Sequence, residues 1–137
     1  MDTNSKFVIK RNEVLQTVET LHINRSKKSV RGSFRGFSFI DDDTKSQIFY
    51  VPSLDISGYG PTIDDAQKMV FDSTDDLFKS LLNMSPNEIQ DVLKEMGWEK
   101  NRIFNKQFSK VSVDAKGQLQ GFNIQKNSLQ TVDLIAA

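Results

Sequence analysis

Residues 33–66 read SFRGFSFIDDDTKSQIFYVPSLDISGYGPTIDDA, and this stretch predicts a strand meander followed by a helix. Apolar residues alternate with small or polar ones over residues 33–40, which is typical of a strand. We expect a second strand at residues 47–51, where a proline ends it, and a third at residues 54–58. Aspartates favour a turn at residues 41–46 because their side chains bond to nearby backbone. Strands joined by such short turns form an antiparallel meander.

Two helices are predicted after the meander. Thr62 is a good N-cap, and Asp65 follows three residues later in a position like that of a capping box. Apolar residues then recur with a period of 3.6 as far as Leu81, so one stripe of this helix should face a sheet. The second helix begins with serine, proline and a box-closing glutamate at residues 85–88, and Gly97 ends it.

The rest of the chain predicts mainly extended structure. Residues 6–24 and 102–113 carry apolar residues among polar ones, as strands do. A turn at residues 114–117 should lead to a weak last strand around residues 122–124. Residues 130–137 are of uncertain order. The predicted fold class is therefore α+β, with a small antiparallel sheet packed by one or two helices.

The composition is that of one small domain spanning residues 1–137. No apolar run approaches the roughly 18 residues of a membrane-spanning helix, and the first residues lack a secretory-signal pattern. The chain has no cysteine, which excludes a disulfide framework, a thiolate nucleophile and a cysteine-based metal site. We therefore expect a cytoplasmic protein without a membrane partner.

The charges are balanced overall but are separated along the chain. There are 18 basic and 18 acidic side chains, with a net charge of +5 over residues 1–40, −8 over 41–91 and +3 over 92–137. The first segment holds a basic cluster near Phe34, Phe37 and Phe39, and its members are Arg25, Lys27, Lys28, Arg31 and Arg35. Such a pattern suits either a nucleic-acid surface, where aromatics stack on bases, or a solvated hairpin.

The acidic middle segment can attract a basic partner. Asp64 and Asp65 also fall in the first turn of a predicted helix, where the helix dipole favours carboxylates without any partner. Tyr59 lies between two glycines, Gly58 and Gly60, which we expect to permit a tight turn from strand to helix. The candidate partner-binding residues are Tyr59, Asp64, Asp65, Asp72, Asp75 and Asp76.

No catalytic, cofactor or metal site is predicted. His22 is the only histidine and lies in a predicted strand, where a structural or exposed role is expected. No serine lies in a G-x-S-x-G pattern, and the two glycines at 58 and 60 lack the lysine of a phosphate-binding loop. An enzyme would need carboxylates brought together from distant segments.

Residues 50–54, 56–60 and 62–66, which read YVPSL, ISGYG and TIDDA, resemble the HicB family of antitoxin-like proteins. That family typically shows a strand ending in Pro-x-Leu, a short strand, a glycine, and a helix opening with Thr-x-acid-acid-Ala. With the flanking element order, the HicB-like core covers about residues 34–83. The second helix, about residues 86–97, ends near a Gly-Trp pair that is similar to longer members of the group.

The resemblance implies a truncated ribonuclease-H-like fold without a catalytic carboxylate set. Antitoxins of this family bind and block a small basic ribonuclease toxin, and many add a C-terminal DNA-binding element. This chain differs there, because residues 101–137 read as extended structure. It also has Asp55 and Ile56 where the family usually has a Gly-Cys pair.

The leading hypothesis is a non-catalytic HicB-like binding protein without a cofactor. It is either an antitoxin that covers a small basic toxin with its acidic segment or a toxin-free HicB-like protein of another role. The alternative from a different class is binding of RNA or DNA by the basic cluster. Small antiparallel sheets with exposed edges often pair, so a homodimer also stays open.

Overall fold

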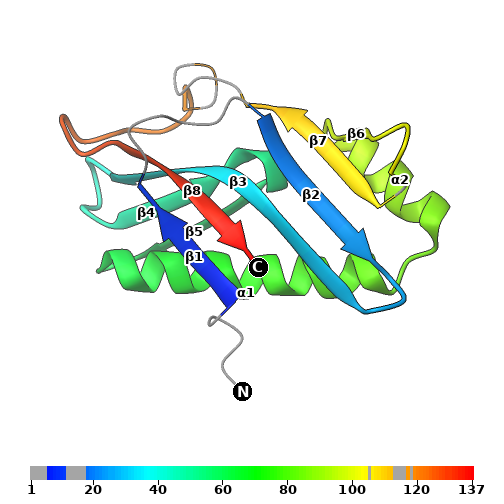
Figure 1. Ribbon diagram of the computed structural model, residues 1–137. Helices are drawn as coiled ribbons and strands as arrows, with labels where there is room; N and C mark the ends of the chain where they lie inside the picture. The colour runs from blue at the N-terminus through cyan, green and yellow to red at the C-terminus, as the bar shows by residue number, and fades with distance from the viewer. Residues whose placement is uncertain (1–5, 12–17, 105, 113–116, 118) are drawn as a thin grey trace.

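The computed structural model describes residues 6–11, 18–104, 106–112, 117 and 119–137 (Figure 1). In these residues the chain is α+β, with an eight-stranded antiparallel sheet and two helices packed on it. The elements run in the order β1 (Phe7–Lys10), β2 (Val18–Asn24), β3 (Ser29–Ile40), β4 (Gln47–Val51), β5 (Ile56–Gly60), α1 (Ile63–Leu82), α2 (Pro86–Glu95), β6 (Glu99–Lys100), β7 (Gln107–Val111) and β8 (Gln130–Ala136). The predicted fold class is confirmed.

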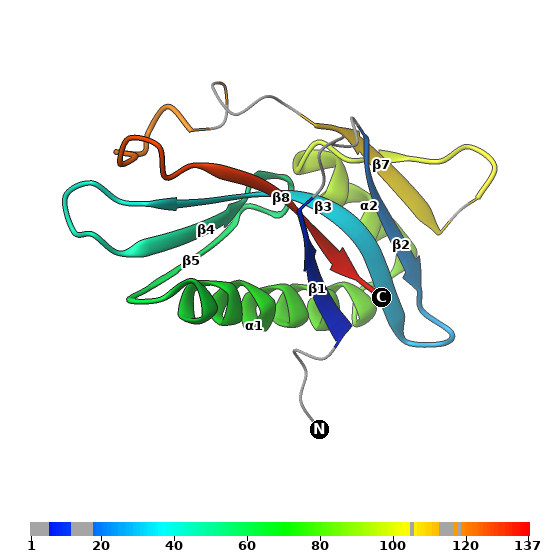
Figure 2. The same cartoon turned by 60° about the vertical axis from the view of Figure 1, so that its left-hand side comes forward.

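The long strand β3 organises the sheet. Along one edge it pairs with β8, from Gly32 opposite Ala136 to Ser38 opposite Gln130. Along its other edge it pairs first with β2 and then with β4. The sheet therefore divides on that side, with β2, β7 and β6 in one branch and the β4–β5 hairpin in the other (Figure 2). The predicted meander of three strands, now β3, β4 and β5, is confirmed.

Both helix starts follow from their capping residues. The Thr62 hydroxyl accepts the backbone N–H of Asp65 at 3.1 Å at the start of α1. At the start of α2, the Ser85 hydroxyl accepts the N–H of Glu88 at 3.2 Å, and the Glu88 carboxylate accepts the N–H of Ser85 at 3.1 Å. This reciprocal capping box satisfies two backbone donors that the helix leaves unpaired. Gly97, with φ +91°, follows the end of α2 as predicted.

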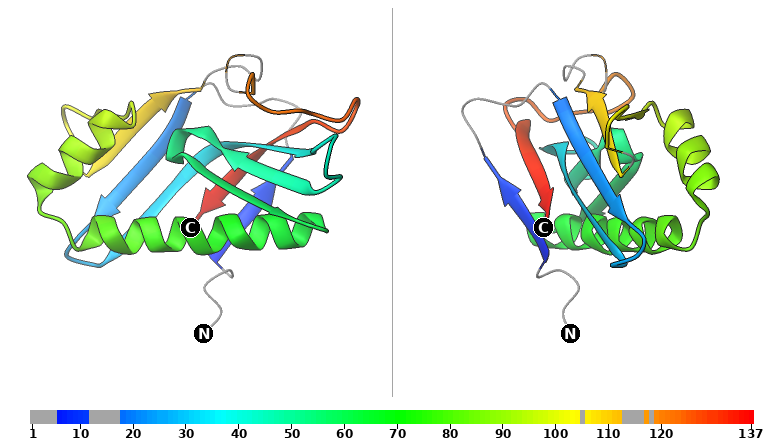
Figure 3. Two further views of the ribbon diagram at one scale, coloured as in Figure 1. Left: turned by 180° about the vertical axis from the view of Figure 1, so that it is seen from behind. Right: turned by 45° about the vertical axis from the view of Figure 1, so that its right-hand side comes forward.

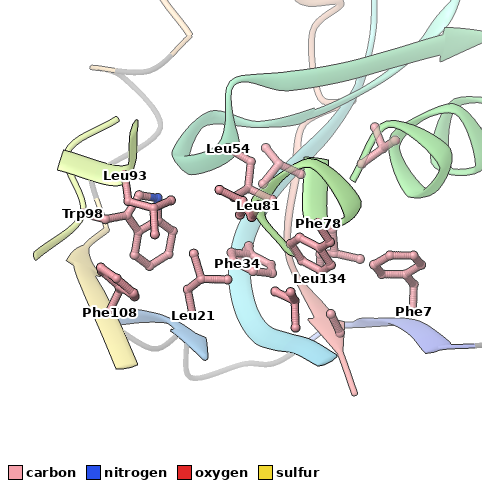
Figure 4. Close-up of a cluster of buried hydrophobic side chains, with 14 of the residues drawn as sticks. Phe7, Leu21, Phe34, Leu54, Phe78, Leu81, Leu93, Trp98, Phe108 and Leu134 are labelled. Carbon is pink, nitrogen blue, oxygen red and sulfur yellow. The ribbon is translucent and has the colours of Figure 1, made fainter. Parts of the chain in front are cut away.

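The main core lies between α1 and one face of the sheet (Figure 4). Phe34 of β3 contacts the aromatic rings of Phe78 from α1 and Trp98, with centroids 6.1 and 5.9 Å apart. The indole N–H of Trp98 donates to the carbonyl oxygen of Ser53 at 3.0 Å, so this buried donor is satisfied. The core therefore ties α1, the sheet and the segment after α2 together.

A second, smaller apolar cluster covers the opposite face of the sheet. Phe37 and Phe39 of β3 are buried there against Leu119. The ring of Phe122 lies edge-on to the ring of Phe39, with their centroids 5.2 Å apart. Residues 122–124 were predicted to form a weak strand, but the structure gives only an isolated bridge between Asp41 and Ile124. The segment acts as an apolar cover rather than as a strand.

The third strand of the meander is shifted relative to its prediction. Residues 52–54 form a 3₁₀ turn with Leu54 buried, and Asp55 adopts a left-handed conformation with φ 53°. The strand β5 then includes Gly58, Tyr59 and Gly60, which were expected to form a turn. The glycines serve close packing instead, because a Cβ at Gly58 would lie 2.3 Å from the carbonyl oxygen of Ala66 in α1.

The end of the chain forms a strand, β8, that was not predicted. Residues 130–137 were expected to be of uncertain order, yet β8 lies between β1 and β3 and pairs with both. Val132, Leu134 and Ala136 alternate and are buried in the main core. This strand joins β1 to the rest of the sheet.

Other extended predictions are confirmed in part. Strands β1 and β2 fall within the expected residues 6–24, and β7 falls within 102–113. Ile103 and Phe104 are exposed and lie outside the strands, because the chain turns there between β6 and β7. Residues 12–17 and 113–116, which include Val14 and most of the predicted turn at 114–117, are outside the described residues.

Neither α1 nor α2, the helices of the described ranges, has the length and apolar character needed to cross a membrane.

Candidate partner-binding surfaces

The exposed side of α1 carries an acidic ridge, defined here as Asp65, Asp72 and Asp76. Spacings of seven and four residues place these carboxylates on one face of the helix. All three are exposed, and none makes an ion pair within the described part of the chain. Asp64 is also exposed, in the first turn of α1 beside this ridge. The structure therefore brings most of the predicted acidic residues to one helix surface.

Asp75 is different from its neighbours because it is buried, with 3% of its surface exposed. Its carboxylate accepts hydrogen bonds from Lys6 and, at 2.9 Å, from Lys79. Burial alone would raise the pKa of Asp75, but the hydrogen bonds and charges of the two lysines outweigh burial and lower it. Asp75 thus ties the segment before β1 to α1, and it does not lie on the predicted partner-binding surface.

We expect Asp75→Asn to lower the free energy of unfolding at pH 7 by about 1.5–3 kcal/mol, the usual contribution of a hydrogen bond to a charged group. Because the folded pKa lies below the ordinary 3.8, this stability is complete above that pH and is lost as the pH falls through the folded value. Urea unfolding at pH 7 and in acid measures this effect. The free energies of unfolding of the wild type and of Asp75→Asn should differ at pH 7 and converge in acid. The exposed Asp76→Asn is the matched control, and an equal loss in both variants would contradict this role.

Tyr59 lies away from the acidic ridge. Its side chain is 64% exposed on β5, which pairs only with β4 among the described strands. Successive side chains of a strand point to opposite faces, and the Cβ position of Gly58 faces α1. Tyr59 therefore points to the face opposite α1. The structure does not unite Tyr59 with the predicted acidic residues.

The basic cluster is also divided. Arg25, Lys27 and Lys28 are exposed in the turn between β2 and β3, and Arg31 follows on β3 opposite His22. Arg35 lies farther along β3 and is half-buried.

The three phenylalanines next to the basic cluster do not reach solvent. Phe34, Phe37 and Phe39 are at most 1% exposed. The interpretation that they stack on nucleic-acid bases is therefore wrong, because stacking requires an accessible ring.

The β2–β3 turn, the end of α1 and the start of α2 come together at one end of the molecule (Figure 3). The side chains of these segments line a basic groove. Its volume is about 1070 Å³. The cations that line it are Arg25, Lys28, Lys79, Lys100 and Lys106, and its described lining includes no carboxylate. Its apolar lining consists of Ile23, Leu82, Pro86, Ile89 and Phe108.

Sequence reasoning identified only two of these cations, Arg25 and Lys28. Lys100 and Lys106 come from the second positive segment, residues 92–137, which the sheet places beside the first. The backbone N–H of Ile23 donates to the carbonyl oxygen of Lys106 at 2.8 Å, which fixes this approach. The positive net charges of residues 1–40 and 92–137 were the only sign of this groove in the sequence. That the two segments lie side by side depends on the pairing of β2 with β7.

His22 lies on β2 beside the basic residues. Its pKa is lowered from the ordinary 6.5 because burial and the charges of Arg31 and Lys106 disfavour the protonated ring. Among the residues that the structure describes, no three histidine, aspartate or glutamate side chains gather in a way that could hold a metal ion.

Comparison of the chain with models of known protein families, with curated proteins and with solved structures finds no match.

Proposed function

We propose that this chain is a non-catalytic HicB-like binding protein that contacts a basic protein partner through the acidic ridge of α1. The observation that carries the proposal is the exposure of Asp65, Asp72 and Asp76 on one helix face, without an ion pair among the described residues. A small basic toxin has the complementary charge. Such complementarity increases the rate of association and favours one class of partner over others.

The resemblance to HicB proteins supports the scaffold part of the proposal. Three residues of the motif at residues 50–66 have a local structural reason. Leu54 is buried, Gly58 allows α1 to approach β5, and Thr62 caps α1. The motif therefore accounts for a sheet-and-helix scaffold whose outward helix face is left for recognition.

The energetics of the helix support a role for the ridge in binding. Asp72 and Asp76 are four residues apart, and like charges at that spacing destabilise a helix by a few tenths of a kcal/mol. Lys68 and Lys79 flank the ridge but make no ion pair with it, since Lys79 is bound to Asp75. The charge of Lys79 already attracts Asp76, and cations of a partner would relieve the remaining repulsion between the carboxylates.

We expect Asp72→Lys with Asp76→Lys to weaken capture of a basic protein from native lysate at least tenfold. The chain offers a matched control in Asp91→Lys with Glu95→Lys, an exposed pair with the same spacing on α2 and the same change in net charge. Quantitative mass spectrometry of the captured proteins measures the effect, and circular dichroism checks that both variants fold. Equal capture by all three proteins would contradict the proposal.

The same capture distinguishes the alternatives. Salt-sensitive recovery of RNA or DNA, lost on reversal of Arg25 and Lys27 but not of Asp72 and Asp76, would favour the nucleic-acid hypothesis. A folded protein that captures neither would leave a HicB-like protein of another role.

A further inference from the structure

We propose that the basic groove binds a small organic anion with an aliphatic body, a medium-chain carboxylate. This ligand site is separate from the acidic ridge and does not depend on the partner proposed for it. The inference combines three properties of the groove: its size, its apolar floor and the cations around it.

The size and floor of the groove suit a small ligand. Its volume, about 1070 Å³, is slightly above the roughly 300–1,000 Å³ typical of ligand pockets. Ile23, Ile89 and Phe108 are nearly buried parts of the core, so they offer a fixed apolar floor, and Leu82 at the end of α1 is half-buried beside them. A ligand with an apolar body would cover the exposed part of this floor.

The cations give the groove its preference for negative charge. Lys79 is bound to Asp75, and the charge of Arg25 acts on the nearby carboxylate of Glu88, whereas Lys28, Lys100 and Lys106 make no ion pair among the described residues. They converge from the β2–β3 turn, β6 and the residue before β7. Cations collected around a concave surface repel one another and concentrate anions there. A bound carboxylate or phosphate would neutralise part of this repulsion.

The floor favours a small ligand over a nucleic-acid strand. Binding of single strands uses accessible aromatic rings on which successive bases stack. Phe108 is the one aromatic ring in the groove's described lining, and it is only 6% exposed. The remaining floor is aliphatic or proline. The apolar body of a small ligand would pack against this aliphatic floor, whereas the phosphate backbone of a nucleic acid would contact only the cations.

The test measures binding of decanoate by titration calorimetry. Acetate is the probe that lacks the apolar body, and 1-decanol is the probe that lacks the charge. We expect decanoate to bind at least tenfold more tightly than either, and more weakly as salt is added. Adenosine monophosphate is titrated in parallel as an anion whose body is a polar ribose and a base, and we expect it to bind at least tenfold more weakly than decanoate.

Variants connect the binding to the groove. We expect Lys28→Glu with Lys106→Glu to weaken the binding of decanoate at least tenfold. The control is Lys27→Glu with Lys126→Glu, which changes the net charge by the same amount at exposed residues outside the groove lining. This control should change binding less than twofold. Leu82→Gln should weaken decanoate but not acetate.

Three results would overturn the inference. They are decanoate binding no more tightly than acetate or adenosine monophosphate, equal effects of the two charge-reversal pairs, or tight binding of a 12-nucleotide RNA by a protein that does not bind decanoate. None of these results bears on the acidic ridge, because the titrations contain no protein partner.

Discussion

Replacing Gly58 by valine is expected to destabilise the fold by about 3 kcal/mol or more, a large part of the roughly 5–15 kcal/mol that stabilises a typical domain. A Cβ at this position would lie 2.3 Å from the carbonyl oxygen of Ala66 and 3.0 Å from side-chain atoms of Met69 and Val70. The nearest atom belongs to the backbone of a helix, so it cannot move aside as a flexible side chain would. The helix α1 must therefore separate from β5.

Chemical denaturation of Gly58→Val and Gly121→Ala measures this effect. A Cβ at Gly121 would meet no atom within 4 Å, so this control should stay within about 0.5 kcal/mol of the wild type. A Gly58→Val protein as stable as the control would show that α1 does not approach β5 as closely as described here.

Leu134→Ala should destabilise the protein by about 2–5 kcal/mol, the range for truncating a fully buried leucine. Leu134 has no exposed surface and lies at the centre of β8, opposite Phe34 of β3 and Ile9 of β1. Truncation of the chain after Leu129 removes all of β8 and leaves β1 without its neighbour in the sheet. We expect the truncated protein to be unfolded.

The exposed Gln130→Ala, at the start of the same strand, is the control for Leu134→Ala and should have little effect. Urea unfolding followed by tryptophan fluorescence is suitable because Trp98 is buried in the core that Leu134 shares. A folded, cooperative protein ending at Leu129 would contradict the central position of β8.

The two destabilising changes mark the limits of what the sequence could predict. The first two strands of the meander, both helices and their caps depend on local signals and were predicted correctly, whereas the third strand was expected at residues 54–58 and lies at Ile56–Gly60. The role of Gly58 was missed because a glycine needed for close packing looks like a glycine needed for a turn. The strand β8 was missed because Asp133 interrupts a short apolar run at the chain end.

The surfaces show a similar limit. Exposure of Asp72 and Asp76 follows from helical periodicity, but burial of Asp75 depends on Lys6, 69 residues away. The basic groove likewise needs Lys100 and Lys106 to come beside the β2–β3 turn. Periodicity predicts which face of an element a residue occupies, whereas convergence of distant side chains requires the topology of the sheet.

The measurement that tests the acidic ridge most directly is zero-length carbodiimide cross-linking of the protein to its captured basic partner. This reagent joins carboxylates to lysines that are in contact. The proposal predicts that cross-linked peptides of this chain come from α1, through Asp72 or Asp76. Cross-links confined to Asp91, Glu95 or other carboxylates outside α1 would contradict it.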